Sequence, residues 1–403
     1  MTHAAAGFPE ASALPSRPDL PDPLVMLDGT RVATPHAWFN RRRPELKALF
    51  QHYMYGSLPL VPGLPSRSVS TEDRGSLGGK ATRKDVTIHF PSDEGPPIHL
   101  LVFIPNKRAR PAPVFLGTNF HGNHTILADP TIPLPTAWMP PGGPGVVDHK
   151  ATDAGRGKDA AVWSIEAAVD RGYAVATFYC GDVAPDRPGP AVAPKEGQLA
   201  WRVDESPAVA AWAWGLIRAV DCLQGDPDLD PGRIAVVGHS RLGKAAILAG
   251  AFDERIALTV AHQAGCGGTA PGRGKVGEQV KQINDRFPHW FAAEFKQFND
   301  HPDRLPFDQN GLIALAAPRP VLLTNATGDA WANPAGQFDV LKAADPAYRL
   351  LGVRGIDDQP MPETGKLVGD RLGYHIRPGK HAMEPRDWTV WLDFADRHMG
   401  PMN

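Results

Sequence analysis

The sequence predicts an α/β protein built as a three-layer sandwich, with helices on both faces of a mainly parallel central sheet. Two observations carry this prediction. Short apolar runs alternate with helical segments through most of the chain, and the runs are continuously apolar instead of alternating with polar residues. A strand that is apolar on both faces belongs to a sheet covered on both sides, and regular alternation with helices makes that sheet parallel.

The first part of the chain predicts elements of a different kind. Residues 1–25 are rich in Ala and Pro and predict a loose N-terminal extension, whereas residues 26–403 predict a single domain. Apolar positions at helical spacing predict a helix over Arg41–Tyr55. Two strands are expected at Asp85–Phe90 and Ile98–Ile104, and the Pro-containing turns that bound them favour an antiparallel pair.

The alternating part of the chain follows these elements. Its predicted strands are Pro113–Leu116, Tyr173–Phe178, Arg233–Val237, Ala257–Val260, Pro320–Leu323 and Tyr348–Val353. Its predicted helices are Val162–Arg171, Ala208–Leu223, Lys244–Phe252, Phe287–Phe295, Ala335–Ala344 and Glu384–His398. From about residue 129 to 160 the chain is rich in Pro and Gly and has no periodicity, which predicts a long loop or insertion.

Composition excludes several classes of protein. The chain has 42 basic and 44 acidic residues and no basic run, so nothing indicates binding to nucleic acid or to an anionic membrane surface. Three scattered cysteines form no C-x-x-C pair, so we expect buried thiols, no zinc site and no cofactor. No stretch matches a membrane span or a signal peptide. We therefore expect a cytoplasmic monomer, or a periplasmic or secreted one if a leader was trimmed from the chain.

The segment Ile234–Ala251 carries the strongest chemical signal. An apolar run ends in Gly-His-Ser-Arg-Leu-Gly-Lys and passes directly into a helix of small residues. This is the layout of a nucleophile elbow, a serine on a tight turn between a strand and a helix, and it predicts an α/β-hydrolase fold with Ser240 as the nucleophile. The usual pattern is G-x-S-x-G, whereas the second glycine here, Gly243, comes one position late.

Two cations lie in the first turn of the helix that follows the serine. Arg241 and Lys244 occupy positions that the helix dipole disfavours by about 0.3–1 kcal/mol each. A charge-assisted contact with a substrate anion or a developing oxyanion offsets that cost, so we expect something negative beside the serine. The alternative is structural pairing with a carboxylate, for which the candidates are Asp182, Asp253 and Glu254.

A serine nucleophile needs a general base, and the base needs a carboxylate that orients it. In the predicted fold the order along the chain is serine, acid, histidine. Asp329 follows the predicted strand Pro320–Leu323, and His381 lies in a Gly/Pro loop before the last helix. His375 is the competing base, but it precedes the Pro-Gly turn. The segment 118–124 is placed to supply a second oxyanion donor, although its sequence equally fits an ordinary Gly/Asn turn.

Five motifs in the second part of the chain together resemble the glucuronoyl esterases, carbohydrate esterase family 15. These are the Gly-His-Ser-Arg-Leu-Gly-Lys segment, Gly265–Gly268, Phe287–Phe291, Gly328–Trp331 and Gly379–His381. The resemblance runs from about Pro113 to the C-terminus. It implies an α/β-hydrolase fold, no metal, and cleavage of esters that join 4-O-methyl-glucuronic acid on xylan to lignin alcohols.

The resemblance also implies roles for individual residues. Ser240 matches the nucleophile, His381 the base, and Arg241 the arginine that helps to form the oxyanion hole. Lys244 matches the lysine that contacts sugar hydroxyls. The expected sugar site further contains Trp331 as an aromatic wall and Glu278 as a polar contact.

The chain departs from the family pattern at one place. Many members carry their catalytic glutamate after the strand that follows the elbow helix, and here that position is Gln263. An amide cannot stabilise an imidazolium by charge, so we expect Asp329 to be the acid. We assign Gln263 to the site as a neutral hydrogen-bonding neighbour, grouped with the substrate-binding residues.

The function expected from the sequence is hydrolysis of glucuronic acid esters, in a small molecule or a polysaccharide, through an acyl-enzyme on Ser240. An acetyl xylan esterase, or another carbohydrate esterase on the same fold, is the nearest alternative. A carbohydrate-binding pseudo-enzyme that kept the pocket but lost catalysis is an alternative of another class.

Overall fold

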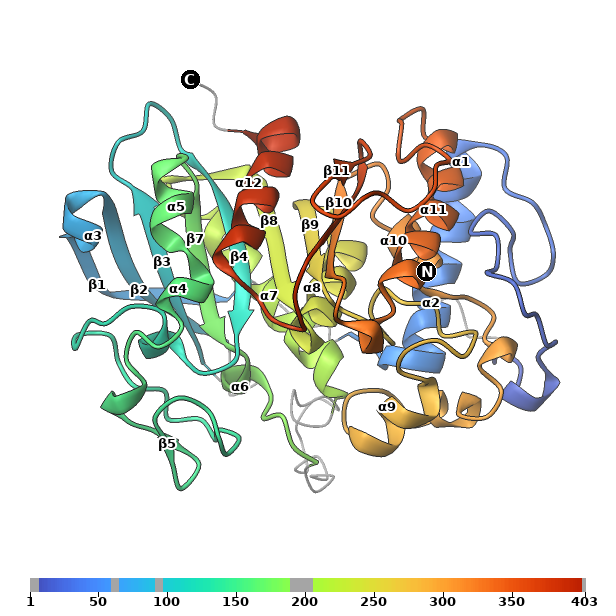
Figure 1. Ribbon diagram of the computed structural model, residues 1–403, viewed down its shortest axis with the longest axis horizontal. Helices are drawn as coiled ribbons and strands as arrows, with labels where there is room; N and C mark the ends of the chain where they lie inside the picture. Colours follow the sequence, from blue (N-terminus) through green and yellow to red (C-terminus); the bar gives the residue numbers. More distant parts are fainter. Residues whose placement is uncertain (1–6, 59–64, 91–96, 189–205, 401–403) are drawn as a thin grey trace.

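The computed structural model of the protein describes residues 7–58, 65–90, 97–188 and 206–400 (Figure 1). Within these ranges ten strands form one sheet, in the order β1-β2-β3-β7-β4-β8-β9-β10-β12-β11. The strands of this sheet are β1 (Ser66–Gly75), β2 (Ala81–His89), β3 (Ile98–Pro105), β4 (Ala112–Asn119), β7 (Ala174–Tyr179), β8 (Leu229–His239), β9 (Ile256–His262), β10 (Val321–Ala326), β11 (Leu367–Val368) and β12 (Leu372–Arg377).

The sheet is parallel in its centre and antiparallel at its edges. Neighbouring strands from β7 through β4, β8, β9 and β10 to β12 run parallel. The strands β1, β2, β3 and β7 pair antiparallel, as do β11 and β12. The expected mainly parallel sheet is confirmed, and so is the antiparallel pair near its start.

Helices cover both faces of the sheet, because inner strands carry apolar side chains on both sides. In β4, Val114 and Leu116 join one core and Phe115 joins the other. The first core is covered by α2 (Arg43–Phe50), α7 (Ala208–Gln224), α8 (Arg241–Phe252), α10 (Gln309–Ala314) and α11 (Pro334–Leu350). The second is covered by α4 (Ala160–Trp163), α5 (Ile165–Asp170) and α12 (Pro385–Met399), of which α5 and α12 lie toward the viewer in Figure 1.

Two predicted elements are wrong, one strand and one helix, and a proline lies in or next to each of them. Residues 348–353 are not a strand, because α11 continues through Pro346 and ends at Leu350. Residues 287–295 are not a helix: α9 (Val280–Arg286) ends before Phe287, and a short 3-10 helix covers Ala293–Phe298. Pro288 follows Phe287 directly and disfavours helical geometry at that residue.

Among the strands longer than two residues, β1 and β12 were not predicted from the sequence. The edge strand β1 is almost wholly exposed and polar, so it has neither alternation nor an apolar run. The buried strand β12 contains a glycine, a histidine and an arginine, which interrupt its apolar pattern. The last parallel strand, which precedes the loop of His381, is therefore β12.

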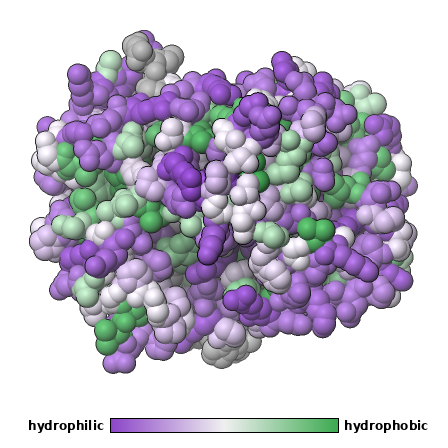
Figure 2. Space-filling model, in the orientation of Figure 1, coloured by the Kyte–Doolittle hydropathy of each residue, from purple (hydrophilic) through white to green (hydrophobic). Residues whose placement is uncertain are grey.

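The N-terminal segment and the Pro/Gly-rich region both have definite contacts. Leu14 and Leu24 are buried, and the Arg17 N–H donates to the Asp303 carbonyl at 2.8 Å. In the region 129–160, β5 (Val146–Val147) and β6 (Lys150–Ala151) form a small hairpin. Hydrophilic residues cover most of the face drawn in Figure 2, with apolar residues in small groups between them.

Within the described ranges, no helix is both long and apolar enough to cross a bilayer. The same ranges contain no cluster of three or more histidine, cysteine or carboxylate side chains arranged to hold a metal ion. All three cysteines are buried free thiols. Burial raises the pKa of Cys180 and Cys266 to about 12, so neither thiol is a nucleophile near neutral pH.

Candidate active site

Ser240 lies on a strained turn between β8 and α8. Its backbone has φ 56° and ψ −127°, a conformation that L-residues rarely adopt. A Cβ on Gly238 would lie 2.1 Å from the Leu242 carbonyl oxygen, and a Cβ on Gly243 would lie 2.9 Å from the Gly238 carbonyl oxygen. The absence of a side chain at positions 238 and 243 therefore allows the start of α8 to lie close to the end of β8.

Three side chains form a hydrogen-bonded relay at this turn. His381 Nε2 lies 2.9 Å from Ser240 Oγ, and His381 Nδ1 lies 2.7 Å from Asp329 Oδ2. Asp329 is buried, and its carboxylate also accepts a hydrogen bond from the Ala332 N–H at 3.3 Å. The relay leads from a buried carboxylate to the histidine, whose side chain is 43% exposed.

The fold brings the acid and the histidine together because their strands are neighbours. Asp329 follows β10 and His381 follows β12, which pair in parallel, so both loops leave the same edge of the sheet. The Gly328 N–H donates to the Gly379 carbonyl at 2.8 Å and ties the loops to each other. The competing histidine, His375, lies inside β12 and is buried, away from this edge.

A second histidine lies against the first. The ring of His239, the last residue of β8, is 4.7 Å from the ring of His381, centroid to centroid. Burial holds the pKa of His239 well below its ordinary value, and the charge on neighbouring histidines lowers it further. A neutral imidazole therefore packs beside the relay.

The Arg241 side chain is held from two sides. Its Nε forms an ion pair with Asp186 Oδ2 at 2.7 Å, and its guanidinium lies 4.5 Å from the ring centroid of Phe120. The partner is therefore not one of the carboxylates considered from the sequence. No hydrogen bond within the described ranges engages the two terminal nitrogens of Arg241, the residue that follows Ser240.

Asp186 is a site residue that the sequence analysis missed. Its Oδ1 accepts from Trp290 Nε1 at 2.7 Å and lies 2.8 Å from His289 Nε2. Burial pushes the pKa of Asp186 upward, but these hydrogen bonds and the charge of Arg241 outweigh it and place the pKa below its ordinary value. His289 and Trp290 belong to a motif of the family resemblance, yet nothing in the sequence connects them to residue 186.

Lys244 is buried one helical turn beyond Ser240. Its ammonium donates to the carbonyl oxygens of Ala264 and Cys266, both at 2.5 Å, and lies 5.9 Å from the ring centroid of Trp290. Burial lowers the pKa of Lys244, and the charge of Glu278 works in the opposite direction. The lysine is thus placed near an expected site carboxylate and bonds backbone carbonyls in place of the alternative partners Asp253 and Glu254.

Glu278 and Trp331 lie side by side, although 53 residues of chain separate them. The Glu278 N–H donates to the Trp331 carbonyl at 2.9 Å. Trp331 is 49% exposed and is one of five large hydrophobic side chains exposed among the described residues. An exposed indole on the loop that carries Asp329 offers a flat apolar surface next to the relay.

Gln263 has a different environment from the other expected site residues. It is 1% exposed, and both polar atoms of its amide bond the backbone of the loop that carries His381. It is therefore a hydrogen-bonding neighbour of the relay. The loop backbone bonds both polar atoms of its amide, which the sequence analysis assigned to substrate binding.

The segment 118–124 forms a compact turn at the end of β4. The Gly122 N–H donates to Asn119 Oδ1 at 2.7 Å, and Asn119 Nδ2 donates to Asn123 Oδ1 at 2.8 Å. Phe120 brings this turn next to Arg241. The geometry is that of an Asn/Gly turn next to Arg241, and the role of the segment as a second oxyanion donor stays a prediction.

Comparisons with known proteins identify the family of the chain. A family model described as "Glucuronyl esterase, fungi" matches residues 160–352. Carbohydrate esterase MZ0003, from an unknown prokaryotic organism, is 46% identical over 98% of this chain and 92% of its own. A promiscuous CE15 esterase from a marine bacterial metagenome superimposes with a TM-score of 0.87 at 45% identity, covering 98% of this chain and 100% of the other. The glucuronoyl esterase from Solibacter usitatus has the same TM-score at 38% identity, covering 96% and 100%.

Proposed function

The chain belongs to carbohydrate esterase family 15, the glucuronoyl esterases, and from this premise we propose that it cleaves glucuronic acid esters through an acyl-enzyme on Ser240. It is a carboxylic-ester hydrolase with an α/β-hydrolase fold. The observation that carries the proposed serine mechanism is the relay from Asp329 through His381 to Ser240, with heavy-atom distances of 2.7 and 2.9 Å.

In this mechanism His381 removes the proton from Ser240 Oγ as the oxygen attacks the ester carbonyl. Asp329 holds the Nδ1–H of His381, which fixes the tautomer and stabilises the imidazolium. The backbone N–H of Arg241, at the start of α8, and its guanidinium stabilise the tetrahedral oxyanion. His381 then gives its proton to the leaving alcohol, and water hydrolyses the acyl-enzyme.

The acid part of the substrate is assigned to the side of the relay that holds Lys244, Glu278 and Trp331. Lysine and glutamate side chains provide the donors and acceptors that sugar hydroxyls need, and the exposed indole provides a face for a sugar ring. Since the His381 side is open, the alcohol leaves toward solvent, and we expect broad tolerance for the leaving group.

The proposal is tested with benzyl glucuronate and acetylated xylan, assayed side by side with the wild type and Ser240→Ala. We expect hydrolysis of the glucuronate ester and loss of at least roughly 10⁴-fold in kcat for the variant, with unchanged folding by circular dichroism. Turnover that persists in Ser240→Ala would contradict the serine mechanism. Faster cleavage of the acetate ester would instead favour the second candidate, a broader carbohydrate esterase, which the promiscuous relative makes a specific alternative.

A serine-reactive phosphonate distinguishes an enzyme from a pseudo-enzyme. An enzyme with a working relay is labelled at Ser240, and the label is found by peptide mass spectrometry. Absence of labelling in the folded wild type would favour a carbohydrate-binding protein.

A further inference from the structure

We propose that Gln263 is a positioning residue that fixes His381 through the two peptide groups on either side of it. The inference rests on the proposed serine mechanism and deepens it, because the position where many family members carry an acid here carries an amide that acts on the loop backbone. It concerns how the histidine is held, and it leaves the acid role to Asp329.

The contacts of the Gln263 amide are complementary to the backbone of the loop. Oε1 accepts the Ala382 N–H at 2.9 Å, and Nε2 donates to the Lys380 carbonyl at 3.2 Å. These two groups belong to the peptide bonds immediately before and after His381. One amide therefore provides the donor and the acceptor that an adjacent strand would otherwise provide.

The backbone of this loop needs such support, because the loop is exposed. Residues 378–381 are all exposed, and Gly379 has φ 121°, a conformation open mainly to glycine. Other bonds reach the carbonyl oxygens of Pro378, Gly379 and Ala382, from Arg377, Arg386, the Gly328 N–H and His262 Nε2. Among the described residues, only Gln263 bonds both of the peptide groups that flank His381 directly.

The same short segment also holds the nucleophile. The His262 carbonyl, at the end of β9, accepts the Ser240 N–H at 2.9 Å, and the Gln263 N–H donates to the Thr324 carbonyl at 2.9 Å. Gln263 itself has φ 49°, so its side chain leaves the strand direction and turns to the loop. A single peptide unit thus fixes the serine on one side and, through the Gln263 side chain, the histidine on the other.

The two bonds require a side chain that donates and accepts hydrogen bonds at the same time, as an amide does. A methionine of similar size leaves the Lys380 carbonyl and the Ala382 N–H without their partner. An ionised glutamate accepts from Ala382 but cannot donate to Lys380, and it sets a negative charge against that carbonyl oxygen. A protonated glutamate restores both bonds, because its hydroxyl donates where the amide nitrogen did.

The test compares Gln263→Met, Gln263→Glu and the wild type in kcat, KM and pH profile on benzyl glucuronate. For Gln263→Met we expect kcat to fall about 10- to 100-fold, because small misplacement of a catalytic group has effects of that size. KM should stay within about twofold, since the substrate side of the site is untouched. A kcat within twofold of wild type would overturn the proposal.

Gln263→Glu tests the proposal through the pH dependence of kcat, which would not change if Gln263 only stabilised the fold. The ratio of its kcat to that of the wild type should be low at neutral pH and rise as the pH falls and the new carboxyl becomes protonated. A variant as active as wild type at neutral pH, or a ratio that does not change with pH, would contradict the proposal. The first of these results would mean that position 263 accepts a catalytic acid.

Gln309→Glu is the matched control for placing a carboxylate in a buried glutamine site. Gln309 is buried and donates to Tyr55 Oη at 3.1 Å and to the Gly268 carbonyl at 2.7 Å, without a bond to the His381 loop. It should lower the melting temperature without a pH-dependent change in the kcat ratio. Failure of the serine mechanism is seen separately, as wild-type activity that survives Ser240→Ala.

Discussion

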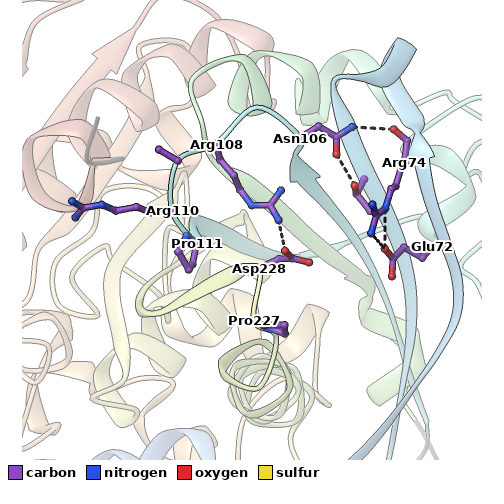
Figure 3. Close-up of a pocket in the computed structure, with 10 residues that line it drawn as sticks. Glu72, Arg74, Asn106, Arg108, Arg110, Pro111, Pro227 and Asp228 are labelled. Atoms are coloured by element: carbon purple, nitrogen blue, oxygen red, sulfur yellow. Dashed lines mark hydrogen bonds and ion pairs between the residues drawn. The ribbon is translucent and has the colours of Figure 1, made fainter.

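An arginine pairs with an aspartate at the carboxyl ends of the parallel strands, and another such pair lies at their amino ends. Only the carboxyl ends have the groups for catalysis. At the carboxyl ends of the strands, Arg241 pairs with Asp186 next to the strained Ser240. At the amino ends of the strands, Arg108, which precedes β4, pairs with Asp228, which precedes β8 (Figure 3). The second pair lines a cavity of about 590 Å³.

The difference lies in what the charges are bonded to. In the cavity of Figure 3, Asp228 also accepts from Lys84 at 2.8 Å, and Glu72 pairs with Arg74 at 3.4 Å. The charges of Glu72, Arg74, Arg108 and Asp228 are thus paired. At the carboxyl ends of the strands, no hydrogen bond from the described residues engages the terminal nitrogens of Arg241, which follows a serine on a strained turn. Backbone strain and converging loops mark the site, and the size of a cavity does not.

Of the substitutions that distinguish the two ends of the strands, Asp329→Asn should have the largest effect on kcat. The neutral side chain cannot stabilise the imidazolium and allows the wrong tautomer, so kcat should fall about 10⁴-fold. Asp228→Asn is the matched substitution at the amino ends of the strands and should leave kcat unchanged. Steady-state kinetics on benzyl glucuronate measure both. A nearly unchanged kcat in Asp329→Asn would remove Asp329 from the relay.

The next effect is on the oxyanion. Arg241→Gln removes a cation aimed at the developing charge, and kcat should fall roughly 10²-fold, the size found for loss of one oxyanion donor. Arg108→Gln removes the matched arginine from the amino-end cavity and should not change kcat. Equal kinetic effects of the two variants would mean that Arg241 acts only through stability.

A smaller effect concerns stability and its dependence on pH. Asp186→Asn should lower the free energy of unfolding by about 1–3 kcal/mol near neutral pH, because a buried acceptor loses its charge-assisted bonds. The pKa of Asp186 in the folded protein lies below its ordinary 3.8, so the carboxylate stabilises the fold above that pH. The advantage of the wild type should therefore shrink as the pH falls through the lower, folded-state pKa.

Urea unfolding at a series of pH values checks this expectation. A difference between wild type and Asp186→Asn that stays constant down to the most acidic pH would contradict it. Asp228→Asn, whose carboxylate is 36% exposed, should show a smaller difference at neutral pH.

The smallest expected effect is that of Trp331→Ala. Loss of an aromatic face removes about 1 kcal/mol of contact with a sugar ring, which corresponds to a rise in KM of about fivefold with little change in kcat. Phe39→Ala removes another exposed aromatic ring, far from Ser240 in the chain, and serves as the control. If both variants leave KM unchanged, Trp331 does not form a wall of the sugar site.

Most of the sheet was predictable, because its inner strands are apolar runs whose signal is local. The elements that were predicted wrongly or missed are those whose sequence pattern is weak or is overridden by tertiary packing. The helix that ends at Leu350 continues through Pro346, and β1 is polar because it lies at an exposed edge. The histidine loop could be placed late in the chain, but the strand that precedes it, β12, could not.

The sequence by itself determined the nucleophile turn and the order of Ser240, Asp329 and His381. The turn is visible because a strand, a small-residue helix and two closely spaced glycines are neighbours in the chain, and the order follows from the topology of the fold. Only the tertiary structure decided that Asp186 holds Arg241 and that Gln263 bonds both sides of His381. These contacts join residues 55 and more than 100 positions apart, and no periodicity or composition along one chain encodes which distant side chains will meet.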